Sequence, residues 1–276
     1  MRRDPSNADS DSAGHRAAPK VQGSQTLLRG IDMLDKVIDG PIKLAELSQR
    51  MGLTRSTTHR LANALIDRGF LTYLPRDGYQ LGPKLIQLGF LAQSQADIVQ
   101  IARPRMEDLA ARTEDTVHLG RLDNDSALYL DKIPGRRRVE ISSRIGDRQP
   151  LTSTGLGKAL LIDSSEAEWE RLFQTDQAHG APKADQAVWF DRMRGYAEAG
   201  HAFDLEENED LIRCVAAPIR DVSGRIVAAI SVSSAAQYMD DARMAELSGE
   251  VRETAQRISG DLGWSPDVRP PRRGRR

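Results

Sequence analysis

The most constraining feature of the sequence is the run Leu-Thr-Arg-Ser-Thr-Thr-His-Arg at residues 53–60, which follows a Met-Gly turn. Hydroxyl residues and cations fill its first two helical turns, and apolar residues follow at Leu61, Ala64 and Leu65 with helical spacing. A helix of this kind, with its apolar face turned away, suits the major groove of DNA. Its hydroxyls and first amides can bind phosphate, while arginine and histidine can reach base edges. We therefore expect a recognition helix.

The sequence around this run predicts a winged helix-turn-helix. A helical stripe precedes it and ends at Asp39-Gly40-Pro41, and Gly69 stands where a helix-terminating glycine is expected. Two short apolar runs separated by Pro-Arg-Asp-Gly then predict a β-hairpin. The expected elements are a helix over 27–38, a second over 42–51, the recognition helix over 54–68 with Thr54 as its N-cap, and strands over 70–74 and 79–81.

The candidate DNA contacts combine positive charge with hydroxyl groups. Arg55 and Arg60 suit guanine edges or phosphates, and the hydroxyls suit the DNA backbone or a thymine methyl. Arg76, at the tip of the hairpin, suits the minor groove or a phosphate. The alternative is an ordinary capped surface helix beside a solvated hairpin. The predicted contacts are Thr54, Arg55, Ser56, Thr57, Thr58, His59, Arg60 and Arg76.

Composition limits how DNA can be bound. The chain has 276 residues, of which 39 are basic and 40 acidic, for a formal net charge of -1. A whole-chain polyelectrolyte is therefore excluded, and affinity for DNA must come from a local group of cations. The single cysteine, Cys214, excludes a disulfide framework and a cysteine-rich zinc site. No apolar run reaches the length of a membrane span and no signal sequence opens the chain, so we expect a cytoplasmic protein without a membrane partner.

Beyond the hairpin, the pattern is typical of an α+β domain. Helices are expected over 83–93, 98–113, 158–162, 166–173, 186–199 and 240–262, and strands over 116–122, 127–133, 139–142, 214–219 and 226–233. A hairpin turn at 221–224 joins the last two strands, which indicates a central antiparallel sheet flanked by helices. The predicted division is a disordered tail over 1–23, the winged domain over 24–83, a linker helix over 84–97, the second domain over 98–264 and a basic disordered tail over 265–276.

Five motifs occur in an order that matches a known family. They are Gly-Ser-Gln-Thr-Leu-Leu-Arg-Gly at 23–30, Ser-Thr-Thr-His-Arg-Leu at 56–61, Thr-Gly-Leu-Gly-Lys-Ala at 154–159, Ile-Arg-Cys-Val-Ala-Ala-Pro-Ile at 212–219 and Ala-Ala-Ile-Ser-Val-Ser at 228–233. Together they make the chain resemble the IclR family of bacterial transcriptional regulators. The resemblance implies a winged-helix domain, a GAF-like effector-binding domain, and dimers or tetramers on palindromic operators. The acidic stretch 204–210 and the segment 252–259 look most like regulators of sugar-acid catabolism.

The resemblance also implies an effector site in the second domain. Amides near Gly155 and serine hydroxyls can donate to a carboxylate, and Asp204 can accept from sugar hydroxyls. Alternatives stay open: a plain glycine turn, a buried apolar role for Cys214, and a solvated turn for Arg138 in its row of three arginines. The acidic run is either a solvated loop or one that covers the site. By resemblance, the effector-binding residues are Arg138, Ile141, Gly155, Leu156, Asp204, Cys214, Ser231 and Ser233.

These features predict a ligand-responsive DNA-binding regulator, in the first place a repressor of a catabolic operon that senses a small carboxylate such as a sugar acid. An activator of aromatic-acid catabolism would have the same architecture. An enzyme is a weaker hypothesis, with Cys214 as nucleophile, His201 as base and Asp204 as orienting group, because the strand around Cys214 is apolar. We predict no catalytic residue, no cofactor and no metal site. The expected partners are operator DNA, the effector and further copies of the chain.

Overall fold

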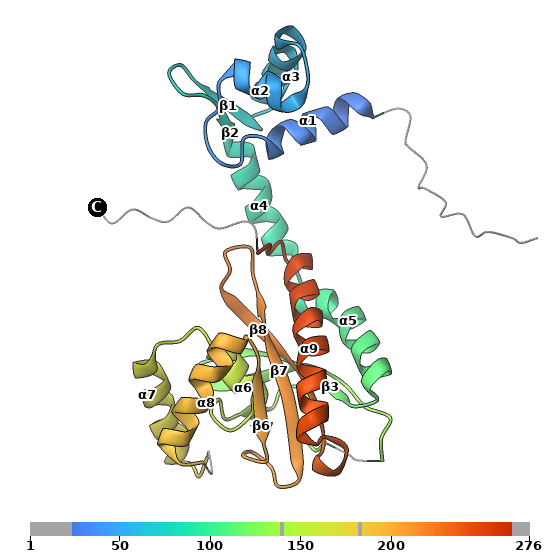
Figure 1. Cartoon of the computed structure of the whole chain (residues 1–276), viewed down its shortest axis with the longest axis vertical. Helices are drawn as coiled ribbons and strands as arrows, with labels where there is room; N and C mark the ends of the chain where they lie inside the picture. Colours follow the sequence, from blue (N-terminus) through green and yellow to red (C-terminus); the bar gives the residue numbers. More distant parts are fainter. Residues whose placement is uncertain (1–23, 139–140, 182–183, 267–276) are drawn as a thin grey trace, which may run out of the picture. The chain divides into compact units, whose positions relative to one another are not determined.

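The computed structural model describes residues 24–138, 141–181 and 184–266. The predicted tail 1–23 and residues 267–276 of the predicted basic tail therefore lie outside the described residues. The chain divides into two compact units between Ser94 and Gln95 (Figure 1). No helix in the described ranges has the length and apolar character needed to cross a membrane.

The first unit is the expected winged helix-turn-helix. The N-cap of the recognition helix is Thr54, whose Oγ1 accepts from the Thr57 amide at 3.3 Å. Gly69 follows the helix with a φ of +75°, the left-handed conformation that ends helices. The elements are α1 (Gln25–Asp35), α2 (Leu44–Met51), α3 (Arg55–Asp67), β1 (Leu71–Leu74), β2 (Gly78–Leu81) and α4 (Pro83–Gln95).

The wing has a third strand-like partner that the sequence did not predict. Ile42 was expected to open the second helix, but its amide donates to the Tyr79 carbonyl at 2.9 Å and its carbonyl accepts from the Tyr79 amide at 2.8 Å. Both backbone groups of Ile42 are thus used by the wing, so α2 begins two residues later. A Cβ at Gly78 would lie 2.2 Å from the Ile42 oxygen, which explains the glycine there. The core of this unit is Met33, Val37, Ile42, Leu47, Ala62, Leu71 and Tyr79.

The second unit is built on a six-stranded antiparallel sheet in the order β5-β4-β3-β8-β7-β6. This agrees with the predicted α+β class. Two of its strands, β5 and β6, were not expected, because segments this short show little alternation. The strands are β3 (Thr116–Asp123), β4 (Ser126–Ile133), β5 (Arg148–Gln149), β6 (Ala202–Leu205), β7 (Ile212–Arg220) and β8 (Ile226–Ala235). The helices are α5 (Ile98–Thr113), α6 (Gly155–Leu160), α7 (Glu166–Gln177), α8 (Gln186–Ala199) and α9 (Asp241–Asp261).

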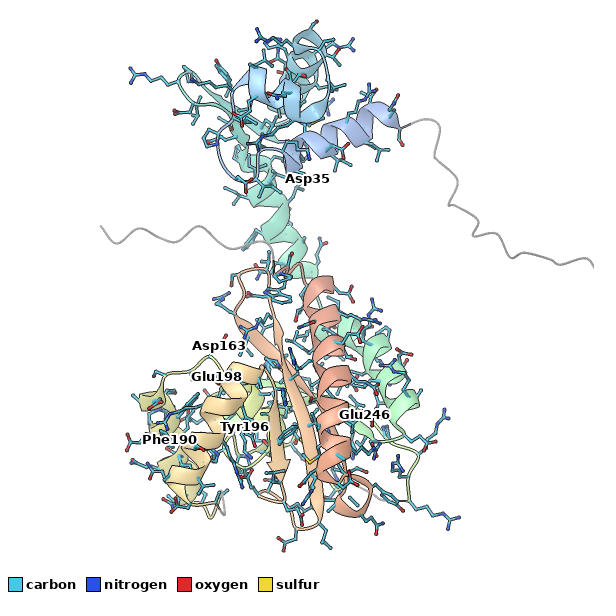
Figure 2. The ribbon with its side chains drawn as sticks, viewed as in Figure 1. Asp35, Asp163, Phe190, Tyr196, Glu198 and Glu246 are labelled. Carbon is cyan, nitrogen blue, oxygen red and sulfur yellow. The ribbon has the colours of Figure 1, made fainter. Side chains whose placement is uncertain are left out.

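Helices cover both faces of this sheet. Helices α5 and α9 pack on one face around Met106, Leu119 and Val251, all with no exposed surface. Helices α6, α7 and α8 lie over the other face, where Trp189 is almost fully buried (Figure 1). Figure 2 labels Tyr196 on α8. Its ring packs edge-on against the ring of Phe203 on β6, with the two ring centroids 5.8 Å apart. Alternation along each strand therefore sends successive side chains into two separate cores.

Two further sequence expectations differ from the structure. The helix expected over 158–162 begins earlier, at Gly155, because the Thr154 side chain accepts from the Gly157 amide at 3.0 Å and caps the helix there. Of the strand expected over 139–142, residues 139–140 lie outside the described residues, and Ile141 and Ser142 belong to no strand.

Candidate nucleic-acid interface and effector cavity

The exposed side of α3 carries the predicted cations. Arg55 and His59 are exposed and stand one turn apart, so their side chains share one strip of the helix surface. Ser56 and Arg60 are also exposed and form the neighbouring strip. The helix therefore presents two parallel rows of hydrogen-bonding side chains on one surface.

Thr58 departs from its predicted role as a DNA contact. Its side chain is fully buried, and its Oγ1 donates to the Thr54 carbonyl at 3.0 Å. Thr58 and Ala62 together form the buried face of α3, while Ala64, which we expected on that face, is exposed. Thr58 thus holds the recognition helix against its own unit and is not presented on its surface.

A cleft of about 680 Å³ lies between α2, α3 and the wing. Three cations converge on it from three separate elements: Lys43 from the start of α2, Arg55 from α3 and Arg76 from the wing. No aspartate or glutamate is among its described lining residues. Lys43 was not predicted from the sequence, because only the pairing of Ile42 with the wing brings it here. The lining is Lys43, Leu44, Ala45, Arg55, His59, Asn63, Ile66, Tyr73, Pro75, Arg76, Gly78 and Tyr79.

These cations differ from many arginines of the second unit in whether they form ion pairs with acidic side chains. Within the described ranges, no ion pair neutralises Lys43, Arg55, Arg60 or Arg76. In the second unit, by contrast, many arginines are paired with acids: Arg171 with Asp125 and Glu168, Arg243 with Asp115, and Arg220 with Asp163. Unpaired cations around a cleft in a chain of net charge -1 are the local arrangement that phosphate binding requires.

The second unit contains a polar cavity of about 360 Å³ on the α6–α8 side of the sheet. It receives side chains from β3, β4, β6, β7 and β8 and from the loops beside them. A volume of this size suits a small ligand. The lining is His118, Tyr129, Ile141, Ser142, Ser143, Gln149, Pro150, Thr154, Gly155, His179, Gly180, Ala181, Asp204, Asn208, Glu209, Ile212, Cys214 and Ser233.

The structure brings five of the eight predicted effector residues to this cavity: Ile141, Gly155, Asp204, Cys214 and Ser233. Strand pairing explains part of this, since Cys214 lies opposite both Asp204 and Ser233 in the sheet. Gly155 leaves room for its neighbours, because a Cβ there would lie 2.5 Å from the Cys214 sulfur.

The other three predicted effector residues lie elsewhere. Arg138 is exposed and is not part of the lining. Leu156 is fully buried in the core against α7 and α8. Ser231 is buried and is not part of the lining. Spacing along one strand placed Ser231 on the same face of the sheet as Ser233, but of the two only Ser233 lines the cavity.

Several lining residues were missed by the sequence analysis. His118 alternates with Val117 and Leu119, which face the opposite core, and this alternation was a usable signal. Its Nε2 lies 2.7 Å from the Ser143 hydroxyl, and its ring stacks on Tyr129 with centroids 5.0 Å apart. Burial, with Lys132 nearby, lowers the pKa of His118 to about 3, so its imidazole is neutral near pH 7.

A buried ion network supports the acidic loop that forms one wall of the cavity. Lys158 on α6 has no exposed surface, forms an ion pair with Glu207 and donates to the Phe203 carbonyl at 2.9 Å. The other Glu207 oxygen accepts from Arg192 on α8 at 2.7 Å. These contacts anchor the loop at the buried Glu207, while Glu209 is exposed. No group of three or more potential metal ligands occurs among the described residues.

The three residues of the enzyme hypothesis do not form a catalytic arrangement. Burial raises the pKa of the Cys214 thiol to about 12, so the nucleophilic thiolate is absent near neutral pH. His201 does not line the cavity, and its Nδ1 lies 3.2 Å from the Ala199 carbonyl. Of the two proposed catalytic partners of Cys214, Asp204 lies beside it and His201 does not.

Comparison with known proteins finds a family match for each of the two units. The family model described as "Bacterial transcriptional regulator IclR C-terminal" matches residues 90–260, and "IclR helix-turn-helix domain" matches residues 26–75. The HTH-type transcriptional regulator XynR of Escherichia coli is 33% identical over 250 residues, which cover 89% of this chain and 99% of that protein. The HTH-type transcriptional regulator KdgR of Escherichia coli is 32% identical over 234 residues, which cover 81% and 86%. The crystal structure of the Agobacterium tumefaciens repressor BlcR has the same fold, with a TM-score of 0.78 at 24% identity over 88% of this chain and 99% of that one.

A winged helix-turn-helix joined to a separate α+β unit is the architecture of a DNA-binding transcriptional regulator. The chain belongs to the IclR family of bacterial transcriptional regulators. It is a DNA-binding regulator and not an enzyme, as predicted from the five motifs.

Proposed function

We propose that this regulator represses a catabolic operon by binding a palindromic operator as a dimer or a dimer of dimers. A small carboxylate, such as a sugar acid, binds the cavity and changes operator affinity. The observation that carries this proposal is the presence of two separate sites, a cationic cleft in one unit and a neutral-to-acidic polar cavity in the other. We place the protein in the cytoplasm, where the operator lies.

In this DNA site, one set of side chains contacts the DNA phosphates and another set contacts the bases. Lys43, Arg55 and Arg76 around the cleft hold phosphates, which fixes the position of the unit on the duplex. Ser56 and Arg60 on the neighbouring strip of α3 then read base edges in the major groove. Two copies on one face of DNA need half-sites about one helical turn apart, or multiples of that distance.

The effector acts through differential affinity. A ligand shifts an equilibrium between two arrangements only if it binds one of them more tightly. By linkage, operator DNA and effector then change each other's affinity by the same factor. Strands β6, β7 and β8 and the loop at 206–210 all contribute side chains to the cavity. A ligand there therefore contacts several strands of the sheet at once.

Self-association is supported by apolar side chains on α1 and α4. On α1, Leu27 is 65% exposed and Ile31 is 49% exposed, one turn apart. On α4, Ile86 is 78% exposed and Phe90 is 71% exposed, again one turn apart, and none of the residues of α4 is buried. Clustered exposed apolar residues mark interaction sites. A second copy of the same helices is the partner that a palindromic operator requires.

Replacing Leu27 and Ile31 together by glutamate is expected to weaken self-association by at least roughly 100-fold, because burying a carboxylate without a partner is costly. Sedimentation velocity over a range of protein concentrations measures the change. Ile145→Glu, at a 61% exposed residue of the second unit, is the matched control and should leave the association state unchanged. If both variants associate to the same extent, α1 does not take part in the interface.

The effector proposal is tested by titrating straight-chain sugar acids and aromatic acids while operator affinity is followed by fluorescence anisotropy. Gly155→Ala is expected to weaken the response at least about tenfold, because its Cβ would lie 2.5 Å from the Cys214 sulfur and displace the lining. Gly195→Ala, in the interior of α8 with nothing within 4 Å of the added Cβ, is the control. A response to aromatic acids alone, with tighter operator binding, would favour the activator instead.

A further inference from the structure

The wing carries two tyrosines that face each other at the cationic cleft. Tyr73 on β1 pairs with Tyr79 on β2 in the register of the hairpin, and both residues line the cleft. Tyr73 is 51% exposed, whereas Tyr79 is 3% exposed and belongs to the core of the unit. Neither was among the DNA contacts predicted from the sequence. The cleft therefore contains an exposed phenol as well as its cations.

Backbone pairing fixes the position of the Tyr73 ring. The amide and the carbonyl of Tyr79 are both hydrogen bonded to Ile42, so both point away from β1. Tyr73 and Tyr79 are thus a non-hydrogen-bonded pair of the hairpin, the kind in which facing side chains lie closest. Their ring centroids are 5.2 Å apart, with the planes at 56°. The buried ring of Tyr79 therefore supports the exposed ring of Tyr73.

The hydroxyl group of Tyr73 is available to a ligand. Within the described ranges this hydroxyl forms no hydrogen bond. Packing on Tyr79 needs only the ring, which a phenylalanine would supply equally well. Burial, with Tyr73 nearby, raises the pKa of Tyr79, so the supporting ring adds no negative charge to the cleft near pH 7. An unused donor in a cleft lined by cations is therefore free to bind the anion that those cations attract.

The place of the cleft in the unit indicates which anion this is. Arg55 and His59 of α3 form one wall, and Tyr73 and Arg76 of the wing form another. When a recognition helix lies in the major groove, the sugar-phosphate backbone that borders the groove runs past the elements beside the helix. In this unit the wing is such an element. The expected acceptor for Tyr73 is therefore a phosphate oxygen of DNA, which a tyrosine hydroxyl can bind without reading the sequence.

We infer that Tyr73 is a further DNA-contact residue, whose hydroxyl donates to one backbone phosphate in each half-site. Lys43 and Arg76 attract the phosphate backbone by charge, and Tyr73 adds a neutral hydrogen bond that holds the wing on it. This inference rests on the proposed DNA site. A neutral donor releases no counter-ions, so the loss of its contact lowers affinity without changing the dependence on salt. That property separates the contact of Tyr73 from those of the cations.

The test is Tyr73→Phe in the full chain, which keeps the ring on Tyr79 and removes only the hydroxyl. Fluorescence anisotropy measures binding to an operator selected by the parent protein from random DNA, at several salt concentrations. We expect binding to weaken about three- to tenfold per half-site, equally for the operator and its single-base variants, with the salt slope of the parent. Arg76→Ala should instead reduce the salt slope by about 1 per half-site. Thr72→Val is the matched control and should bind as the parent does, since it removes a hydroxyl from the opposite face of β1, outside the cleft lining.

Operators with a single methylphosphonate in each half-site distinguish a direct contact from a packing role. If Tyr73 binds one phosphate, the penalty of Tyr73→Phe should disappear when that phosphate is replaced and persist at the other positions. Equal affinity of Tyr73→Phe and the parent for the unmodified operator would overturn the inference. So would a penalty that persists at every methylphosphonate position, which would assign Tyr73 to packing. If the parent itself selects no operator, the proposed DNA site is wrong and the inference falls with it.

Discussion

Replacing Glu207 by methionine is expected to lower the free energy of unfolding of the second unit by roughly 3–5 kcal/mol. Glu207 is 6% exposed and Lys158 has no exposed surface, so the ammonium group would remain buried without its carboxylate partner. Arg192, which bonds the same carboxylate at 2.7 Å, would also lose its acceptor. Removing one partner of a buried pair costs far more than the net value of the pair, because the remaining charge has lost both water and its counter-ion.

Urea titration followed by tryptophan fluorescence measures this effect. The three tryptophans of the chain, Trp169, Trp189 and Trp264, all belong to the second unit, so the signal reports that unit alone. Glu206→Met is the control, since its ion pair with Arg213 is partly exposed and should be worth about 1 kcal/mol or less.

The double variant Lys158→Met with Glu207→Met removes both charges and should recover most of the lost stability. If Glu206→Met and Glu207→Met lower the free energy of unfolding equally, the buried ion network adds no more stability than the partly exposed ion pair. A double variant no more stable than Glu207→Met alone would mean that the loss comes from packing and not from the uncompensated charge.

Arg60→Ala and Lys43→Ala are expected to weaken operator binding in different ways. Loss of a bidentate base contact by Arg60 should cost about 1–3 kcal/mol per subunit and relax the base preference at one position of each half-site. Loss of a phosphate contact by Lys43, in the cleft beside Arg55 and Arg76, should weaken all sequences alike and reduce the salt slope by about 1. The distinction follows from their places, since Arg60 lies on the outer strip of α3 and Lys43 lines the cleft.

The measurement is fluorescence anisotropy with an operator selected by the parent protein from random DNA, at several salt concentrations and against single-base variants. Arg50→Ala is the control. It is an exposed arginine at the end of α2 that pairs with Glu46 and does not line the cleft. If Arg60→Ala weakens binding to all DNA sequences alike and leaves the base preference intact, Arg60 contacts the DNA phosphates and not the bases.

The sequence predicted best those parts whose signals are local. The cap at Thr54, the glycine at Gly69 and the hairpin turn are each decided within a few residues, and the recognition helix follows from them. Thr58 was assigned to the wrong side of that helix, although it stands four residues before Ala62 on the buried face. A hydroxyl at a buried helical position looks like a ligand in the sequence, and only its hydrogen bond to the Thr54 carbonyl shows that it is satisfied internally.

The effector cavity depends on contacts between residues that are far apart in the chain. Its walls come from β3 near residue 118 and from β6, β7 and β8 beyond residue 200, brought together because β3 pairs with β8. The family resemblance supplied five of its lining residues. Alternation along the strand was a usable signal for the face on which His118 lies, but only the sheet order showed that His118 and Tyr129 share a cavity with residues beyond position 200.

By itself, the sequence determined that this chain folds as a winged helix-turn-helix followed by an α+β unit of the IclR family, because periodicity, caps and turns act over short distances. Tertiary structure alone decided that Lys43 joins Arg55 and Arg76 at the cleft and that Glu209 joins Asp204 at the cavity. Lys43 reaches the cleft through the pairing of Ile42 with Tyr79, and among the described residues the buried Lys158 forms its ion pair with Glu207. Both outcomes depend on backbone pairing and burial between distant segments, which no local pattern encodes.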